Sequence, residues 1–171
     1  MKKAIDRAGR LQHWLVALPA LWLVLTSPWI GMRRIVPDSA TFWDRVHIGL
    51  GLALTVLAVT YLVTNVIDGR WRQHFAWLAG NLSEVRSDFN AIVRLRVPSA
   101  DGAGLFAVIQ GLLLLLLLAA ALTGVGWLMA DGARVALVWR EWHIVSADCF
   151  AWLLVVHVLA SALHLLDFLI G

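Results

Sequence analysis

GAGLFAVIQGLLLLLLLAAALTGVGWLMA, at residues 102–130, runs for 29 residues without a charged side chain. A helix needs about 20 mainly apolar residues to cross the hydrocarbon core of a bilayer. The stretches 11–32 and 46–67 are each uncharged over 22 residues, and 142–166 contains a single charge, Asp148. The sequence therefore predicts four membrane-spanning helices, at about 11–32, 46–67, 102–130 and 142–169.

The composition agrees with a membrane protein. The chain has 171 residues, of which 61% are hydrophobic and 15% charged, and its mean hydropathy is +0.80. A typical soluble domain has about 25% charged residues. Between the second and third apolar stretches, apolar residues recur at three- and four-residue spacings from Trp71 to Val93, the pattern of an amphipathic helix at a membrane surface. We expect an all-α integral membrane four-helix bundle, up-down-up-down, with this interfacial helix, as one domain over residues 1–171.

The basic residues predict the orientation. The N-terminal segment and the loop 68–101 hold nine Lys and Arg, whereas the loops 33–45 and 131–141 hold five. The positive-inside rule then puts both termini in the cytoplasm of a bacterium, with the chain in the inner (cytoplasmic) membrane. The net charge of +3 therefore reflects topology and lipid headgroups, and we expect the bilayer as a partner and no nucleic acid.

Cysteine chemistry is excluded by count. Cys149 is the one cysteine, so the chain has no intramolecular disulfide, no thiolate zinc site and no cysteine-ligated iron–sulfur cluster. It also lacks the C-x-x-C-H attachment motif of c-type haem. Any cofactor needs other ligands.

Histidines are the candidates. Five of the six lie in or at the ends of apolar helices, where an ionisable side chain is costly and usually functional, although one alone is explained equally well by a helix–helix hydrogen bond. His47 and His143 each begin a helix that re-enters from the same side of the membrane. His157 follows His143 by 14 residues, about 21 Å along the axis and about 40° round the helix. His74, in the polar loop, is expected to be solvated.

Imidazoles at two depths suit six-coordinate haem iron held between helices, with partners for helix four from His47 at one level and His13 at the other. A structural zinc site would need three or four ligands at one level, and a proton channel would need acids between the levels. Glycines near these histidines would let a porphyrin approach the backbone, and close helix packing explains them equally well. These glycines are Gly49, Gly51, Gly124 and Gly126.

The motifs Arg7…His13-Trp14 and Arg45-Val46-His47-Ile48-Gly49, with His143 and His157 fourteen residues apart, resemble the four-helix di-haem cytochrome b family. That family includes the membrane subunits of formate dehydrogenases and nickel–iron hydrogenases. The resemblance implies two haems b, one ligated by His13 and His157 near the cytoplasm and one by His47 and His143 near the periplasm. It implies electron transfer between a periplasmic-side redox partner and the quinone pool, in an electron-transfer subunit of an oxidoreductase complex without catalytic residues of its own.

Two parts of the site are open at this stage. If helix four enters the bilayer near residue 145, His164 lies nearer the level of His13 than His157 does, although the family spacing favours His157. The family places quinone at the start of helix three, where residues 102–106 keep the small residues of its Asn-Ala-Gly-Gln-Lys motif but lack the polar ones. Candidate groups on the quinone side are Gly102, Gly104 and His164, with Ser99, Asp101 and Gln110 explained as well by helix capping or an interfacial position.

Three further hypotheses complete the set. Arg45 and Arg140 flank the outer histidines and could contact haem propionates or lipid headgroups. The loops 33–45 and 131–141 are expected to dock the redox partner, with Trp43 and Trp139 as anchors. The alternative functions are a stand-alone di-haem cytochrome that oxidises superoxide with quinone, which shares a third helix-four histidine at the position of His164, and a haem-free transporter or scaffold.

Overall fold

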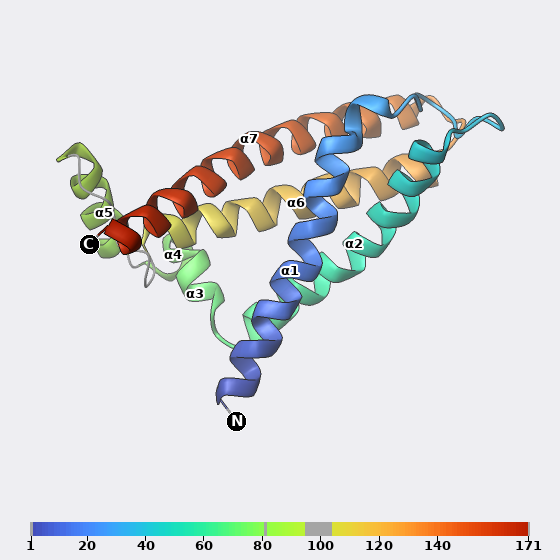
Figure 1. Cartoon of the computed structure of the whole chain (residues 1–171). Coiled ribbons are helices and arrows are strands. Elements are labelled where there is room, and N and C mark those ends of the chain that lie inside the picture. Colours follow the sequence, from blue (N-terminus) through green and yellow to red (C-terminus); the bar gives the residue numbers. More distant parts are fainter. Residues whose placement is uncertain (1, 81, 95–103, 171) are drawn as a thin grey trace. The chain divides into compact units, whose positions relative to one another are not determined.

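The computed structural model describes residues 2–80, 82–94 and 104–170, with the side chains of residues 2–8, 164, 166–168 and 170 left out. Its long elements are α1 (Lys2–Thr26), α2 (Phe42–Ile67), α6 (Leu105–Met129) and α7 (Val135–Ile170) (Figure 1). Within the described residues, each contains a segment long and apolar enough to cross a membrane: Gly9–Trp29, Phe42–Ile67, Leu105–Met129 and Val135–Leu163. The predicted all-α integral membrane helical bundle is confirmed.

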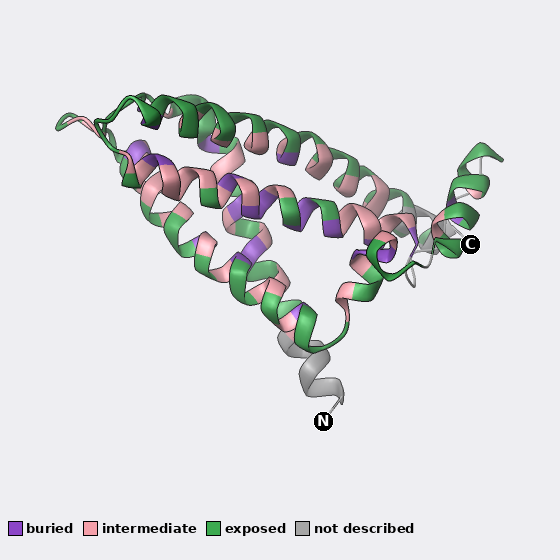
Figure 2. Cartoon of the chain, turned by 180° about the vertical axis from the view of Figure 1, so that it is seen from behind, coloured by how far each residue is buried: buried purple, intermediate pink, exposed green. Residues whose placement is uncertain are grey.

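The apolar side chains of these helices remain largely exposed. Figure 2 shows exposed residues recurring along all four long helices, and large apolar side chains such as Trp152 are 75% exposed. In water this surface would be strongly unfavourable, whereas lipid tails solvate it without cost. The most buried of the spans is α6, where 39% of the apolar window is covered by protein against 6% in α7.

The helix boundaries differ from those predicted from uncharged runs. Three helices begin earlier than expected, at Lys2, Phe42 and Val135, because charged residues end a hydrophobic stretch without ending a helix that continues into water. The first helix stops sooner, at Thr26, where Pro28 cannot donate a backbone hydrogen bond and Ser27–Trp29 tightens into the 3₁₀ turn η1. The third begins at Leu105, and residues 102–103 lie outside the described part.

The expected single amphipathic helix over 71–93 is wrong. The segment forms three short helices, α3 (Trp71–His74), α4 (Ala76–Ala79) and α5 (Ser83–Val93). The first break is at Phe75, whose φ of −118° and ψ of 53° are not helical, and the second is at Gly80, whose φ of 71° is left-handed. Apolar periodicity continues across these breaks in the sequence, and glycine ends α4 at a backbone conformation that it adopts without strain.

The chain packs as two compact units. The first contains Met1–Val63 and Leu116–Asp148, and the second contains Thr64–Leu115 and Cys149–Gly171. The long helices α2, α6 and α7 each contribute to both. The single domain expected over residues 1–171 stays a prediction.

In the first unit, the connection between α1 and α2 is fastened to the end of α6 and the start of α7. Met32 is buried with Trp127 and Ala136 in a small apolar core. The Trp127 indole N–H donates to the Arg33 carbonyl at 2.8 Å, and the Arg140 Nε–H donates to the Met32 carbonyl at 3.1 Å. These bonds satisfy loop carbonyls that would otherwise lose their partners near the membrane. The connection therefore caps the helix ends of this unit.

Candidate functional site

His47 of α2 and His143 of α7 face each other in the first unit. Their ring centroids are 6.0 Å apart and their planes are inclined by 86°. Two imidazoles that bind one metal ion from opposite sides have centroids about 6 Å apart, since each metal–nitrogen bond is about 2.0 Å and each ring adds its own radius. The separation fits a bis-histidine ligand pair, as predicted for these two residues from their positions at the starts of their helices.

A backbone hydrogen bond sets the tautomer of His143. Its Nδ1 lies 2.7 Å from the carbonyl oxygen of Ala120 in α6. Because a carbonyl only accepts, Nδ1 carries the proton and Nε2 keeps the lone pair that a metal ligand requires. Ligating histidines in proteins usually donate their second N–H to such a carbonyl or carboxylate, which fixes the ring and raises its basicity.

Glycines of α6 make room for the two aromatic rings that pack on it. A Cβ at Gly124 would lie 3.1 Å from Nδ1 of His143, and a Cβ at Gly126 would lie 2.7 Å from the Trp139 indole. Close packing therefore explains both glycines. By contrast, a Cβ at Gly49 or Gly51, two and four residues after His47 on α2, would meet no atom within 4 Å among the described residues. Close packing therefore does not explain these two glycines, and only Gly51 lies on the face of α2 that carries His47.

The position of His47 is set by a capping box at the start of α2. The Asp44 carboxylate, 2% exposed, accepts hydrogen bonds from the Thr41 N–H at 2.9 Å and from the Gly31 N–H at 3.0 Å. In return the Thr41 hydroxyl oxygen accepts the Asp44 N–H at 3.2 Å. His47 follows Asp44 by one helical turn, and its Nδ1 is buried without a hydrogen-bond partner among the described residues. A buried polar nitrogen of this kind is costly, which fits a group that is completed by a ligand.

His13 packs on the other end of α2. Its ring centroid lies 6.5 Å from that of Tyr61, within the first unit. Tyr61 follows His47 by 14 residues, about 21 Å along α2. His13 and His47 therefore lie at two levels of α2 separated by about four turns.

His157 lies on α7 in the second unit, 14 residues after His143. Its ring stacks on Phe106 of α6 with centroids 4.9 Å apart and planes inclined by 23°. Phe106 lies 14 residues before Ala120 on α6, and His157 lies 14 residues after His143 on α7. His143 and His157 thus each contact α6, at positions that are 14 residues apart on both helices.

The choice between His157 and His164 as the inner ligand stays a prediction. The argument from depth assumed membrane entry near residue 145, whereas the apolar span of α7 begins at Val135, 22 residues or about 33 Å before His157. The side chain of His164 lies outside the described part.

The other predicted site residues are two arginines, two glycines and the loop histidine. The Arg45 Nε–H donates to the Ala40 carbonyl at 3.3 Å, and the Arg140 side chain is partly used by the Met32 carbonyl, so their contact with propionates stays a prediction. Gly104 is buried against Asp88, and Gly102 lies outside the described residues. His74 is not solvated as expected: it is half-buried, and its backbone carbonyl approaches Gly111 of α6 closely.

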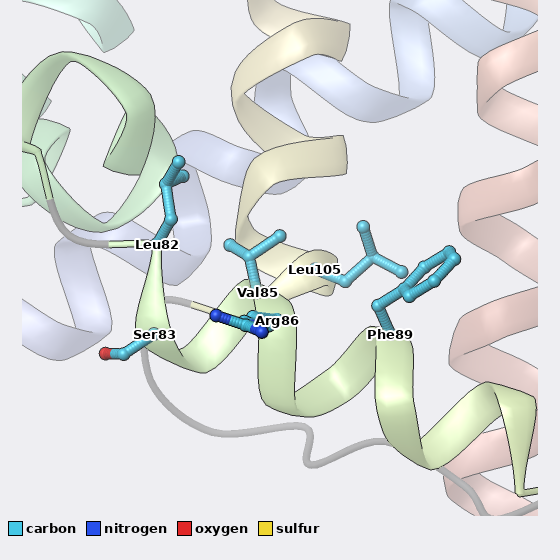
Figure 3. A pocket seen from close by; sticks show the side chains of 6 residues that line it. All are labelled: Leu82, Ser83, Val85, Arg86, Phe89 and Leu105. Atoms are coloured by element: carbon cyan, nitrogen blue, oxygen red, sulfur yellow. The ribbon is translucent and has the colours of Figure 1, made fainter.

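An apolar groove lies beside the start of α6 in the second unit (Figure 3). Val85 and Phe89 on successive turns of α5 point to the same side as Leu105, while the Ser83 hydroxyl points away from them. Its volume is about 580 Å³, within the range of small-molecule sites. Leu82, Ser83, Val85, Arg86, Phe89 and Leu105 line it.

Sequence reasoning missed five residues that contact or position the histidines. Thr41-x-x-Asp44 ahead of an apolar run is a capping-box pattern and could have been found. Tyr61 and Phe106 stand at 14-residue intervals from His47 and Ala120, a signal that has meaning only once the helices are paired. Ala120 acts through its carbonyl oxygen, which no side-chain pattern indicates.

Comparison with known proteins adds one positive finding. The family model described as prokaryotic cytochrome b561 matches residues 4–167. No curated protein and no solved structure matches the chain. The match covers all four membrane spans and the histidines described above, and it confirms the prokaryotic cytochrome b resemblance. The chain therefore belongs to the prokaryotic cytochrome b561 family and is a bacterial membrane protein of b-type haem electron transfer.

Proposed function

We propose that the chain binds two haems b through two histidine pairs, His47 with His143 and His13 with His157. The observation that carries the proposal is the His47–His143 pair, with 6.0 Å between ring centroids and the Nδ1 of His143 bonded to the Ala120 carbonyl. The 14-residue intervals on α2 and α7 support the second pair at a level about 21 Å away.

When bound, b-type haem accepts and donates single electrons. The residues of the chain hold the two groups in the bundle, and ligation from both sides leaves no open coordination position for oxygen or another small molecule. We therefore propose a transmembrane electron carrier between a redox partner on the periplasmic side and quinone, as the cytochrome b subunit of an oxidoreductase complex.

For the quinone end, the groove beside Leu105 supports the proposal. It has apolar walls suited to a hydrophobic tail, and Arg86 is the one charged residue among those that line it. The groove lies next to Gly104, one of the small residues that the family resemblance associates with quinone.

Single histidine substitutions test the ligand assignment. Haem is quantified as pyridine haemochrome per chain in the wild-type protein and in His13→Ala, His47→Ala, His143→Ala and His157→Ala. We expect two haems in the wild type and one in each variant, with His47→Ala and His143→Ala losing the same spectral species. His74→Ala is the control and should retain both. One haem or none in the wild type, or loss of haem in His164→Ala with retention in His157→Ala, would contradict the assignment.

A further inference from the structure

Phe106 is the aromatic partner of His157. The small interplanar angle of 23° and the centroid separation of 4.9 Å describe stacking rather than an edge-to-face contact. A stacked ring covers one face of the imidazole and forms no hydrogen bond with its nitrogens. The contact therefore restrains the plane of His157 without occupying the atoms that would bind a metal.

Phe106 is itself held in place by a carboxylate from another helix. The Asp88 Oδ2 of α5 accepts the Leu105 N–H, one residue before Phe106, at 2.8 Å. This N–H belongs to the first turn of α6, where no intrahelical acceptor exists and where negative charge is favourable. Asp88 is 4% exposed, so the bond is shielded from water.

Gly104 makes this arrangement possible. A Cβ at this position would overlap the Asp88 carboxylate, so a larger residue would displace that carboxylate from the Leu105 N–H. Asp88 therefore binds Leu105 at the start of α6, and the next residue, Phe106, stacks on His157. All four residues belong to the second unit.

We propose that Phe106 is a positioning residue that sets the ring plane of His157, with Asp88 fixing the turn of α6 that carries Phe106. The proposal rests on the proposed function, in which His157 is a haem ligand. Groups that orient an axial histidine tune the potential and electronic structure of the iron it binds.

The test uses the full-length protein purified in detergent with its haems. Phe106→Leu removes the ring, Phe106→Met keeps a similar volume without a planar face, and Phe106→Tyr keeps the face. Phe150→Leu is the matched control, because Phe150 is a buried phenylalanine, 6% exposed, in the same unit. Redox titration gives the midpoint potential of each haem, and electron paramagnetic resonance gives the low-spin ferric signals.

We expect Phe106→Leu and Phe106→Met to shift the potential and the low-spin signal of one haem, the one lost in His157→Ala, and to leave the other unchanged. Phe106→Tyr should resemble the wild type, and Asp88→Asn should shift the same haem in the same direction. If the Phe106→Leu protein does not accumulate in the membrane, the Phe106→Met variant provides the test of the proposal. Unchanged potentials and signals in a haem-replete Phe106→Met protein would overturn the proposal while leaving the ligand assignment intact. Retention of both haems in His157→Ala would overturn the ligand assignment and this proposal with it.

Discussion

The Nδ1 of His143 lies 2.7 Å from the carbonyl oxygen of Ala120, so a backbone group of α6 determines which nitrogen of a histidine on α7 is free to bind. The bond requires the imidazole to lie close against α6, and Gly124, one turn further along that helix, provides the space. Orientation, tautomer and access of the ring therefore depend on one short stretch of a neighbouring helix.

Gly124→Ala tests this dependence. The new methyl group would lie 3.1 Å from Nδ1 and 3.2 Å from Cε1 of His143, which forces the ring away from α6. We expect a reduced content of the haem assigned to His47 and His143 and normal content of the other. Gly126→Ala is the control, because two residues away it crowds Trp139 more strongly, with 2.7 Å between the new methyl group and the indole. Equal haem loss in both variants would mean that general crowding of α6, and not the His143 ring, is responsible.

Asp44→Ala should destabilise the protein without removing a ligand. The change deletes the capping box of α2 and leaves the Gly31 and Thr41 N–H groups unpaired, at a cost of about 1–3 kcal/mol. Thermal unfolding in detergent should show a lower Tm, with two haems still bound in the folded protein below the transition. Asp38→Ala, at an exposed position in the same connection, should have little effect. An equal fall in Tm for both would argue against the cap.

Trp127→Phe should loosen the connection between α1 and α2. The variant loses the indole N–H that binds the Arg33 carbonyl, a net contribution of about 1 kcal/mol, but keeps most of the apolar packing with Met32. Trypsin should then cleave faster after Arg33 or Arg34 than in the wild type. Trp152→Phe, at a position that is 75% exposed, is expected to leave the cleavage rate unchanged.

The orientation predicted from the basic residues can be measured with reporter fusions. Alkaline phosphatase is active only when exported, so fusions after Pro37 and after Gly132 should be active, and those after Arg72 and at the C-terminus should be inactive. The reason is the excess of Lys and Arg, nine against five, on the side of the termini. The reverse pattern of activities would mean that the chain has the opposite orientation in the membrane, with the proposed partner surface in the cytoplasm.

The docking surface proposed on the loops 33–45 and 131–141 depends on aromatic anchors, because their five arginines nearly balance four acids. Trp43 already contacts three other aromatic rings, those of Trp22, Trp29 and Phe42. We expect Trp43→Ala and Trp139→Ala, at normal haem content, to slow reduction of the outer haem by the native donor. Trp152→Ala should not. Unchanged donor kinetics in both loop variants would remove this surface from consideration.

The four membrane spans follow from the sequence alone, because the bilayer imposes a length and an apolar composition that can be counted residue by residue. The histidines were identified for the same reason: an ionisable side chain in an apolar helix is conspicuous. The boundaries were less accurate. Arg140 and Glu141, for example, lie inside α7, since a helix does not end where the membrane does.

The partners of the histidines were decided by tertiary structure. Ala120 acts through a carbonyl oxygen that every residue possesses, and Phe106 is one apolar residue among many until α6 and α7 pair in register. By itself the sequence determined which helices cross the membrane and which residues are able to bind a metal. Only the packing of neighbouring helices decided how those residues are oriented, because hydrogen bonds and ring contacts depend on positions in space that are not encoded by local composition or periodicity.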